Sequence, residues 1–156
     1  MTDKENKTVK VIGRAEIVRF PLLGDHKVHA RIDSGARTSA IWGSASVKDS
    51  VLHVFFFGDE SNEYTFETFG RQAVASSNGH IDKRYTIKMP VVLKGKRIFA
   101  TFTIANRSTQ VYPVLIGRNV LRGKFIVDVT LGKTLSSKEQ SKIKDLEKLV
   151  EEEDGK

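Results

Sequence analysis

The sequence contains no cysteine at all. Neither a disulfide framework nor a thiolate metal site is therefore possible. The sequence also lacks any apolar run that approaches the roughly 20 residues of a membrane-spanning helix. The opening stretch, MTDKENKTVK, is polar and has no apolar signal-peptide core. We therefore expect no membrane association and a cytoplasmic location, although the absence of cysteine leaves the periplasm open.

Charge is unevenly distributed along the chain. Residues 134–156 contain five Lys and seven Asp or Glu, which leaves 21 basic and 12 acidic residues before Thr134, a formal charge of +9. Such a body could attract nucleic acid or acidic polypeptides, but scattered solvated lysines give the same balance. The aromatic-plus-basic spacing of an RNA-binding strand is absent. We therefore do not expect a nucleic-acid partner. A basic nucleic-acid-binding β-barrel is kept as an alternative, which a steep salt dependence of binding would support.

Short strand-like segments fill residues 9–129. In KVHARID, Val28, Ala30 and Ile32 alternate with polar residues, which predicts a strand with one buried and one exposed face. Further strands are predicted for VLHVFFF, YTFETF, RYTIKMPVVL and RIFATFTIA. KGK at residues 94–96 predicts a tight turn, and the Asn-Gly pair of SSNGH, residues 76–80, predicts a hairpin because both residues accept positive φ.

The charged segment after Thr134 predicts a helix. Ser136 or Ser137 supplies an N-cap. The large apolar residues that recur at helical spacing are Ile143, Leu146, Leu149 and Val150. Ile143, Leu146 and Val150 approximate a heptad seam, so the helix could be a coiled-coil dimerisation element. Two heptads at most is short for an independently stable coiled coil, and a helix that packs on the body or frays in solvent is favoured over it.

One acidic residue, Asp33, stands at the end of the strand predicted for KVHARID and is followed by Ser34, Gly35 and Ala36. Gly35 tolerates backbone conformations that other residues avoid, and Ser34 offers a hydroxyl that can lock a loop by hydrogen bonding. Such a loop could expose the carboxylate for chemistry. An Asp that only caps a turn gives the same pattern, so this stretch alone does not decide between the two.

A second stretch, YPVLIGRNVL at residues 112–121, adds the context. Together with DSGA, it resembles the retropepsin-like aspartic proteases. In that family an Asp-Thr/Ser-Gly-Ala loop carries the catalytic carboxylate, and an apolar-apolar-Gly segment passes behind the loop before a short helix. The resemblance implies that Asp33 is catalytic. It implies that the active-site loop is formed and supported by Ser34, Gly35, Ala36, Leu115, Ile116 and Gly117.

The chain also resembles a bacterial family over a longer stretch than these two motifs, from about Ile12 to Asp128. It is retropepsin-like, carries the label "ATP-dependent zinc protease", and is associated with ATP-grasp peptide ligases of the glutamate-adding kind. The matching segments are IGRAEIVRFPLLGDHKVHARIDSGARTSAI, SSNGH, RYTIKMPVVL and VLIGRNVLRGKFIVD. The implied fold is all-β, a retropepsin-like (acid protease) closed β-barrel with a C-terminal helical tail. The expected organisation is a disordered segment at 1–8, the retropepsin-like domain at 9–133 and a charged helical tail at 134–156.

The residues do not support the zinc and ATP parts of that label. A phosphate-binding loop of the form GxxxxGK(S/T) is absent, and so is His-Glu-x-x-His. His26 and His29 are three residues apart, but His29 belongs to a predicted strand and no third ligand is evident. We expect carboxylate chemistry, with no metal and no other cofactor.

Aspartic proteolysis uses two carboxylates that share one proton, and the sequence offers a single Asp-Ser-Gly motif. The resemblance therefore implies a homodimer in which two copies of Asp33 meet across a two-fold axis. The resemblance implies that the SSNGH hairpin could serve as a flap over the cleft, and an ordinary surface hairpin gives the same pattern. Where viral retropepsins usually have two acidic residues this chain has Arg37 and Thr38, which favours acidic peptides or a C-terminal carboxylate as substrate. The expected substrate contacts are Arg37, Thr38, Ser77, Asn78, Gly79 and His80.

The leading prediction is an aspartic endopeptidase that cleaves a peptide or protein substrate. One alternative keeps the fold without catalysis, as a peptide- or partner-binding module linked to an ATP-grasp peptide-ligase system. The intact DSGA argues against this alternative, because a binding module has no need of that carboxylate.

Overall fold

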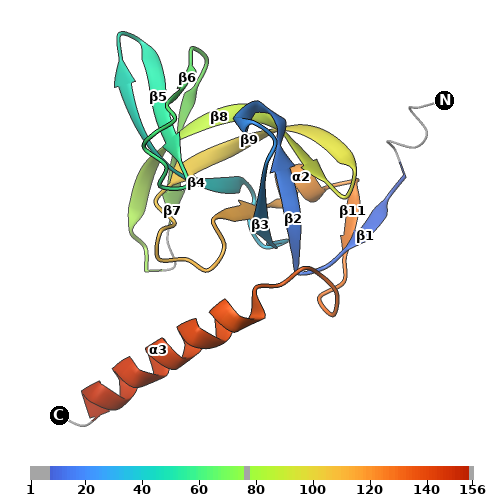
Figure 1. The fold of residues 1–156 in the computed structure, drawn as a ribbon, viewed down its shortest axis with the longest axis vertical. Coiled ribbons are helices and arrows are strands. Elements are labelled where there is room, and N and C mark those ends of the chain that lie inside the picture. Colours follow the sequence, from blue (N-terminus) through green and yellow to red (C-terminus); the bar gives the residue numbers. More distant parts are fainter. Residues whose placement is uncertain (1–7, 76–77, 155–156) are drawn as a thin grey trace.

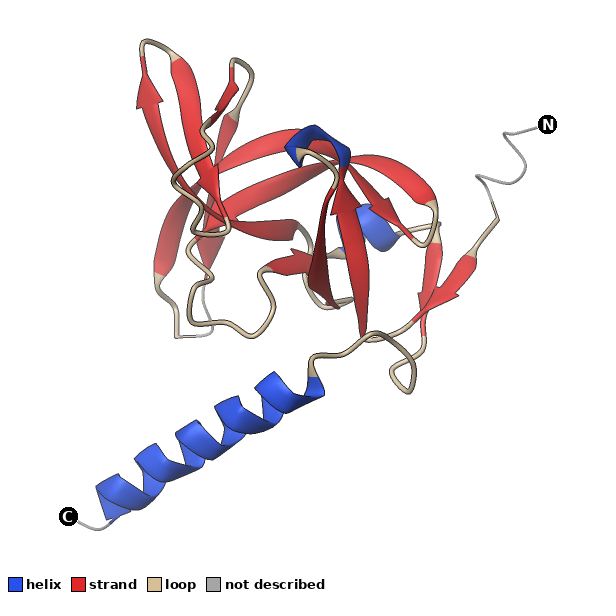
Figure 2. Ribbon diagram, in the orientation of Figure 1, coloured by secondary structure: helices blue, strands red, loops and turns tan. Residues whose placement is uncertain are grey.

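A computed structural model describes the chain at residues 8–75 and 78–154. Six of its strands form a closed barrel (Figures 1 and 2). Neighbours pair in the order β10–β3–β2–β8–β9–β4, and β4 pairs with β10 again, which closes the ring. The barrel strands are β2 (Ala15–Phe20), β3 (His26–Ile32), β4 (Ser39–Lys48), β8 (Ile81–Leu93), β9 (Lys96–Ala105) and β10 (Val114–Ile116). The predicted all-β closed barrel is confirmed.

The remaining strands extend this barrel. β4 continues beyond it and pairs with β5 (Val51–Phe56), which pairs with β6 (Tyr64–Phe66), and the three project as a ribbon at the upper left of Figure 1. β7 (Gly70–Ala75) pairs with the first half of β8. β1 (Lys10–Ile12) and β11 (Phe125–Val127) form a small parallel sheet of their own. The short helical turns are η1 (Pro21–Leu23) and α2 (Arg118–Leu121).

The core fills the barrel because alternate residues of each strand point inward. In β8 the buried positions follow this period of two, at Ile87, Met89, Val91 and Leu93. Phe20 and Phe102 meet edge to face inside the barrel, with ring centroids 5.5 Å apart. Burying such a side chain stabilises the fold by about 1.5–3 kcal/mol.

Both predicted turns connect the strands that the sequence indicated. Lys94 and Gly95 join β8 to β9 with φ values of 50° and 77°, the positive values that a tight hairpin requires. The hairpin of β7 and β8 is also present, but its last paired residues are Ala75 and Ile81. Five residues, 76–80, therefore separate the paired ends.

The C-terminal helix, α3 (Ser136–Asp154), begins at one of the two predicted capping serines. Figure 1 shows it leaving the lower side of the barrel and extending away from it. Its first turns are tied to the barrel, because the Tyr112 hydroxyl donates to Glu139 Oε1 at 2.6 Å and Lys142 Nζ donates to the Thr109 carbonyl at 2.9 Å. Among the described residues, no helix combines the length and apolar character needed to cross a membrane.

Candidate active site

Asp33 directly follows β3, at the place where three strands meet. β10 lies between β3 and β4, with Ile116 opposite Ile32 on one side and Leu115 opposite Ala40 on the other. The loop at 33–38 links β3 to β4 and therefore crosses in front of the end of β10. The backbone N–H of Asp33 donates to the Ile116 carbonyl at 2.8 Å, which holds the loop at the point that carries the carboxylate.

The segment behind the loop approaches it closely at Gly117. A Cβ at this position would lie 2.3 Å from the Thr38 carbonyl oxygen and 2.9 Å from that of Ala36. Only glycine permits this contact between two backbones. The next residue, Arg118, donates its backbone N–H to the Ala36 carbonyl at 2.8 Å. The predicted support of the loop by an apolar-apolar-Gly segment therefore has a direct geometric counterpart.

Ser39, the first residue of β4, connects this support to the barrel. Its hydroxyl is fully buried, accepts a hydrogen bond from the Gly117 N–H at 2.9 Å and donates one to Asn119 Oδ1 at 2.7 Å. Asn119 Nδ2 in turn donates to the Thr101 carbonyl of β9 at 2.8 Å. Sequence reasoning missed Ser39 and Asn119. The signal that could have identified Ser39 is a serine directly before the apolar residues Ala40 and Ile41 at the start of a strand.

The Asp33 carboxylate is half-buried, and its Oδ1 accepts the Gly35 N–H at 3.0 Å. It borders a groove of about 470 Å³. The loop, β10 and β9 form one part of the groove wall, and the β7–β8 hairpin forms another. The described lining residues are Asp33, Ala36, Arg37, Thr38, Ala40, Gln72, Ala73, Val74, Ala75, Arg84, Thr103, Arg107 and Leu115.

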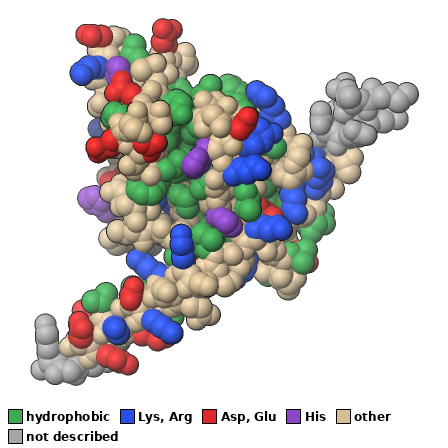
Figure 3. Space-filling model, viewed as in Figure 1, with side chains coloured by type: hydrophobic (Ala, Val, Ile, Leu, Met, Phe, Trp, Pro, Cys, Tyr) green, Lys and Arg blue, Asp and Glu red, His purple; other side chains and the backbone are tan. Residues whose placement is uncertain are grey.

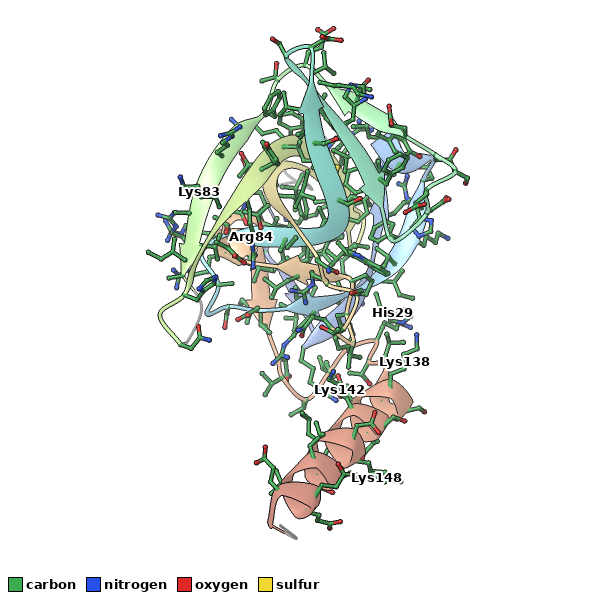
Figure 4. All side chains as sticks on the ribbon, turned by 90° about the vertical axis from the view of Figure 1, so that its left-hand side faces the viewer. His29, Lys83, Arg84, Lys138, Lys142 and Lys148 are labelled. Atoms are coloured by element: carbon green, nitrogen blue, oxygen red, sulfur yellow. The ribbon has the colours of Figure 1, made fainter. Side chains whose placement is uncertain are left out.

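Positive charge dominates this groove, because Arg37, Arg84 and Arg107 line it together with one carboxylate. Burial lowers the pKa of Arg107, the positive charges of Arg84 and Arg31 lower it further, and Asp33 acts in the opposite direction. A guanidinium nevertheless stays protonated in proteins. Arg107 is held in place by its Nε, which donates to the Tyr112 carbonyl at 3.0 Å. Figure 4 shows Arg84 on the inner side of β8, with Lys83 on the outer side.

The structure brings most of the predicted site residues together. Asp33, Ala36, Arg37, Thr38 and Leu115 line the groove. Two others, Ile116 and Gly117, are buried behind the loop, and Ser34 and Gly35 are exposed at its tip.

Among its described residues, the structure does not place the predicted substrate contacts of the hairpin tip in the groove lining. Asn78, Gly79 and His80 are not among the described residues that line the groove, and Ser77 lies outside the described residues. The hairpin contributes β7 and Arg84 to the groove wall. Its tip at 78–80 lies beyond the paired strands. No sequence signal marked Arg84 or Arg107, since each is one of many basic residues in the chain.

Metal-ligating side chains do not gather at this site. Over residues 8–75 and 78–154, no three His, Asp or Glu side chains are placed to hold a metal ion. The ring of His26 stacks on Phe57 with centroids 5.0 Å apart. His29 is three positions further along the same strand and therefore lies on the opposite face. The donor set does not fit a zinc site.

A closed six-stranded barrel in which an Asp-Ser-Gly loop crosses the end of a short apolar strand that is followed by glycine defines a retropepsin-like barrel. The chain belongs to the RimB-like family, described as "Retropepsin-like aspartic endopeptidase RimB", whose family model matches residues 11–139. The expected membership of a bacterial retropepsin-like family is therefore confirmed. The family description names aspartic chemistry.

Similar curated proteins are named for a ligase. A "Probable alpha-L-glutamate ligase" of Shewanella halifaxensis is 32% identical over 136 residues, covering 76% of this chain and 28% of the relative. A protein of the same name from Desulfotalea psychrophila is 26% identical over 140 residues, covering 78% of this chain and 28% of the relative. The chain thus spans little more than a quarter of the length of these relatives.

A solved structure shares the fold. The crystal structure of a Legionella pneumophila protein of unknown function, assigned to DUF785, superposes with a TM-score of 0.57 at 20% sequence identity. The match covers 81% of this chain and 98% of the other. At this identity, the likeness supports the barrel architecture and carries nothing about activity.

Proposed function

We propose that this protein is an aspartic endopeptidase that works as a homodimer, each chain contributing Asp33. The observation that carries the proposal is the position of Asp33, whose backbone is held by Ile116 while its carboxylate borders an open groove. The family description, retropepsin-like aspartic endopeptidase, supports the same chemistry.

The reaction needs a second carboxylate. Asp33 is the one acidic residue among the described residues that line the groove. Two carboxylates held close together cannot both ionise easily, so the pair shares a proton and titrates as a unit. In the proposed dimer this second group is the partner subunit's Asp33. The exposed position of Ser34 and Gly35 at the loop tip suits an approach of two such loops.

In the proposed mechanism, the ionised carboxylate of the pair accepts a proton from a water molecule. The water oxygen attacks the carbonyl carbon of the peptide bond, and the protonated carboxyl donates its proton to the carbonyl oxygen. The tetrahedral diol then collapses and the C–N bond breaks. The proton held by the first carboxyl passes to the leaving nitrogen, and one diol hydroxyl returns its proton to the second carboxylate. The products are a new carboxyl terminus and a new amino terminus, and the pair returns to its singly protonated state.

The substrate in this proposal is an acidic peptide. Arg37, Arg84 and Arg107 can pair with carboxylate side chains, and hydrogen bonds between charged partners are stronger than neutral ones. The curated relatives are named as glutamate ligases, and glutamate is an acidic amino acid of the kind that these arginines can pair with. We therefore propose glutamate-rich peptides as the substrate. An ATP-grasp glutamate ligase is the proposed functional partner, and the cytoplasm is the proposed location.

A second candidate is a catalytically silent module that binds peptides for such a ligase. It is favoured by the curated relatives, in which the matched region is 28% of a protein named as a ligase. The two candidates differ in whether the Asp33 carboxylate is needed.

The deciding experiment incubates the full chain with matched acidic, neutral and basic peptides from pH 4 to 8, at several protein concentrations. We expect cleavage of the acidic set, a rate per chain that rises with protein concentration until the dimer is saturated, and loss of cleavage in Asp33→Asn. Peptide binding without cleavage by a well-folded dimer at every pH would support the silent module. Cleavage that survives Asp33→Asn would contradict the aspartic mechanism.

A further inference from the structure

The apolar face of α3 is left uncovered by the described part of its own chain. Ile143, Leu146, Leu149 and Val150 have exposed fractions of 50, 52, 59 and 57%. An amphipathic helix usually buries such a stripe against a neighbouring element. Here an open cavity of about 610 Å³ lies between the helix and the barrel, with Ile143 and Leu146 on one wall and Ile32 and Val111 among the barrel residues opposite.

The charge of α3 changes sign along its length. Residues 136–146 contain three Lys and two acidic residues, a net charge of +1, whereas residues 147–154 contain one Lys and five acidic residues, a net charge of −4. Figure 3 shows acidic side chains gathered toward the free end of the helix. Two copies of this helix attract each other in antiparallel orientation and repel each other at the acidic ends in parallel orientation.

The position of α3 relative to Asp33 indicates where a second copy would lie. Ile32, which precedes Asp33 in the chain, and Leu146 line the same cavity. The middle of α3 is therefore on the same side of the barrel as the strand end that carries Asp33, so a dimer formed through the Asp33 loops brings two copies of α3 toward each other. The open space between the barrel and the helix then lies on the side of the molecule that faces the partner.

We propose that α3 packs antiparallel against α3 of a second copy of this chain, through Ile143, Leu146 and Val150. The spacing of three and four residues places these side chains in one line along the helix. In the register where Leu146 lies against the partner subunit's Leu146, Ile143 meets the partner subunit's Val150, and every residue of the line has an apolar neighbour. A shift by one turn in either direction brings one of them against a glutamate.

A helix pair of this length is too short to hold two chains together alone. It therefore acts together with the contact between the Asp33 loops, and the inference rests on the homodimer of the proposed function.

The first test measures dimerisation of the full chain by sedimentation velocity over a concentration series. The variant is Leu146→Gln, and the matched control is Lys148→Gln, which lies on the opposite face of α3. Figure 4 labels Lys148 on the helix. We expect Leu146→Gln to raise the dimer dissociation constant about tenfold or more, the loss of roughly 1.4 kcal/mol, and Lys148→Gln to leave it near that of the parent protein. Because Leu146 is half-exposed, the barrel stays folded in both variants, which circular dichroism verifies.

The second test determines the orientation, and the absence of cysteine in the chain makes it direct. A disulfide requires Cα atoms within about 7 Å. We expect Leu146→Cys to cross-link to itself under mild oxidation, Ile143→Cys and Val150→Cys to cross-link poorly alone, and an equimolar mixture of those two variants to cross-link well. Efficient self-cross-linking at all three positions would establish a parallel pair and overturn the proposal.

The outcomes separate this inference from the proposed peptidase. A parent protein that dimerises and cleaves peptides, with both properties unchanged in Leu146→Gln, would overturn the helix pair and leave the peptidase standing. A Leu146→Gln variant that dimerises as before but cleaves faster would also overturn it, and would make α3 an inhibitory element. A parent protein that is monomeric at every concentration would overturn both.

Discussion

The buried hydroxyl of Ser39 accepts the backbone N–H of Gly117 at 2.9 Å, so the start of β4 and the strand behind the Asp33 loop are locked together. Gly117 also touches the Thr38 and Ala36 carbonyls so closely that no side chain fits. The loop is therefore positioned by backbone contacts from behind and by one serine from the side. This arrangement leaves the carboxylate itself unobstructed at the groove.

Replacing Ser39 by alanine tests that lock. The change leaves the Gly117 N–H buried without its acceptor, and an unsatisfied buried donor costs about 1–3 kcal/mol. We expect Ser39→Ala to lower the free energy of unfolding by that amount and to reduce peptidase activity. Ser46→Ala, at an exposed position of the same strand, serves as the control and should change stability by less than about 0.5 kcal/mol. Equal stability of the two variants in urea titrations would show that the Ser39 bond does not hold the loop.

Arg107 is a partly buried cation of the groove, and burial is the largest cause of its lowered pKa. Arg107→Gln removes a charge that an acidic substrate could pair with, and hydrogen bonds to charged groups contribute about 1.5–3 kcal/mol. We expect kcat/KM for a glutamate-rich peptide to fall about tenfold or more, with a much smaller change for a neutral peptide. Arg97→Gln, on an exposed position near the opposite end of β9, controls for the loss of overall charge. A similar loss on both peptides would mean that Arg107 supports the fold rather than selecting the substrate.

Tyr112 and Glu139 make the anchor of α3 sensitive to pH. The hydrogen bond from the Tyr112 hydroxyl lowers the pKa of Glu139 below its ordinary value of 4.5. A carboxyl with a lowered pKa in the folded state stabilises that state above its ordinary pKa, and this stability is lost as the pH falls through the lowered value. We expect the free energy of unfolding to decrease less between pH 6 and pH 3 in Tyr112→Phe than in the parent protein. Tyr64→Phe removes a hydroxyl elsewhere and should follow the parent curve, and identical slopes in all three proteins would contradict the expected linkage.

Local sequence patterns were sufficient where neighbours along the chain control the structure. The alternation in KVHARID predicted β3, the Lys-Gly pair predicted the turn between β8 and β9, and the apolar spacing after Thr134 predicted α3. The motifs DSGA and VLIGRN also predicted that Asp33 and Gly117 lie close together, because the order of the two motifs matches a known family. The substrate contacts predicted at the hairpin tip stay a prediction, because the tip lies beyond the last paired residues, Ala75 and Ile81.

The sequence by itself determined strands such as β3, β8 and β9, the helix, the family and the candidate carboxylate, because these depend on local periodicity and on a recognisable motif. Only the tertiary structure decided that Ser39 and Asn119 lock the loop, and that Arg84 and Arg107 line the same groove as Asp33. These pairs are separated by long stretches of chain, and closure of the barrel brings them together. The uncovered face of α3 was likewise decided by tertiary structure, because the direction in which the helix leaves the barrel is set by Tyr112 and Glu139.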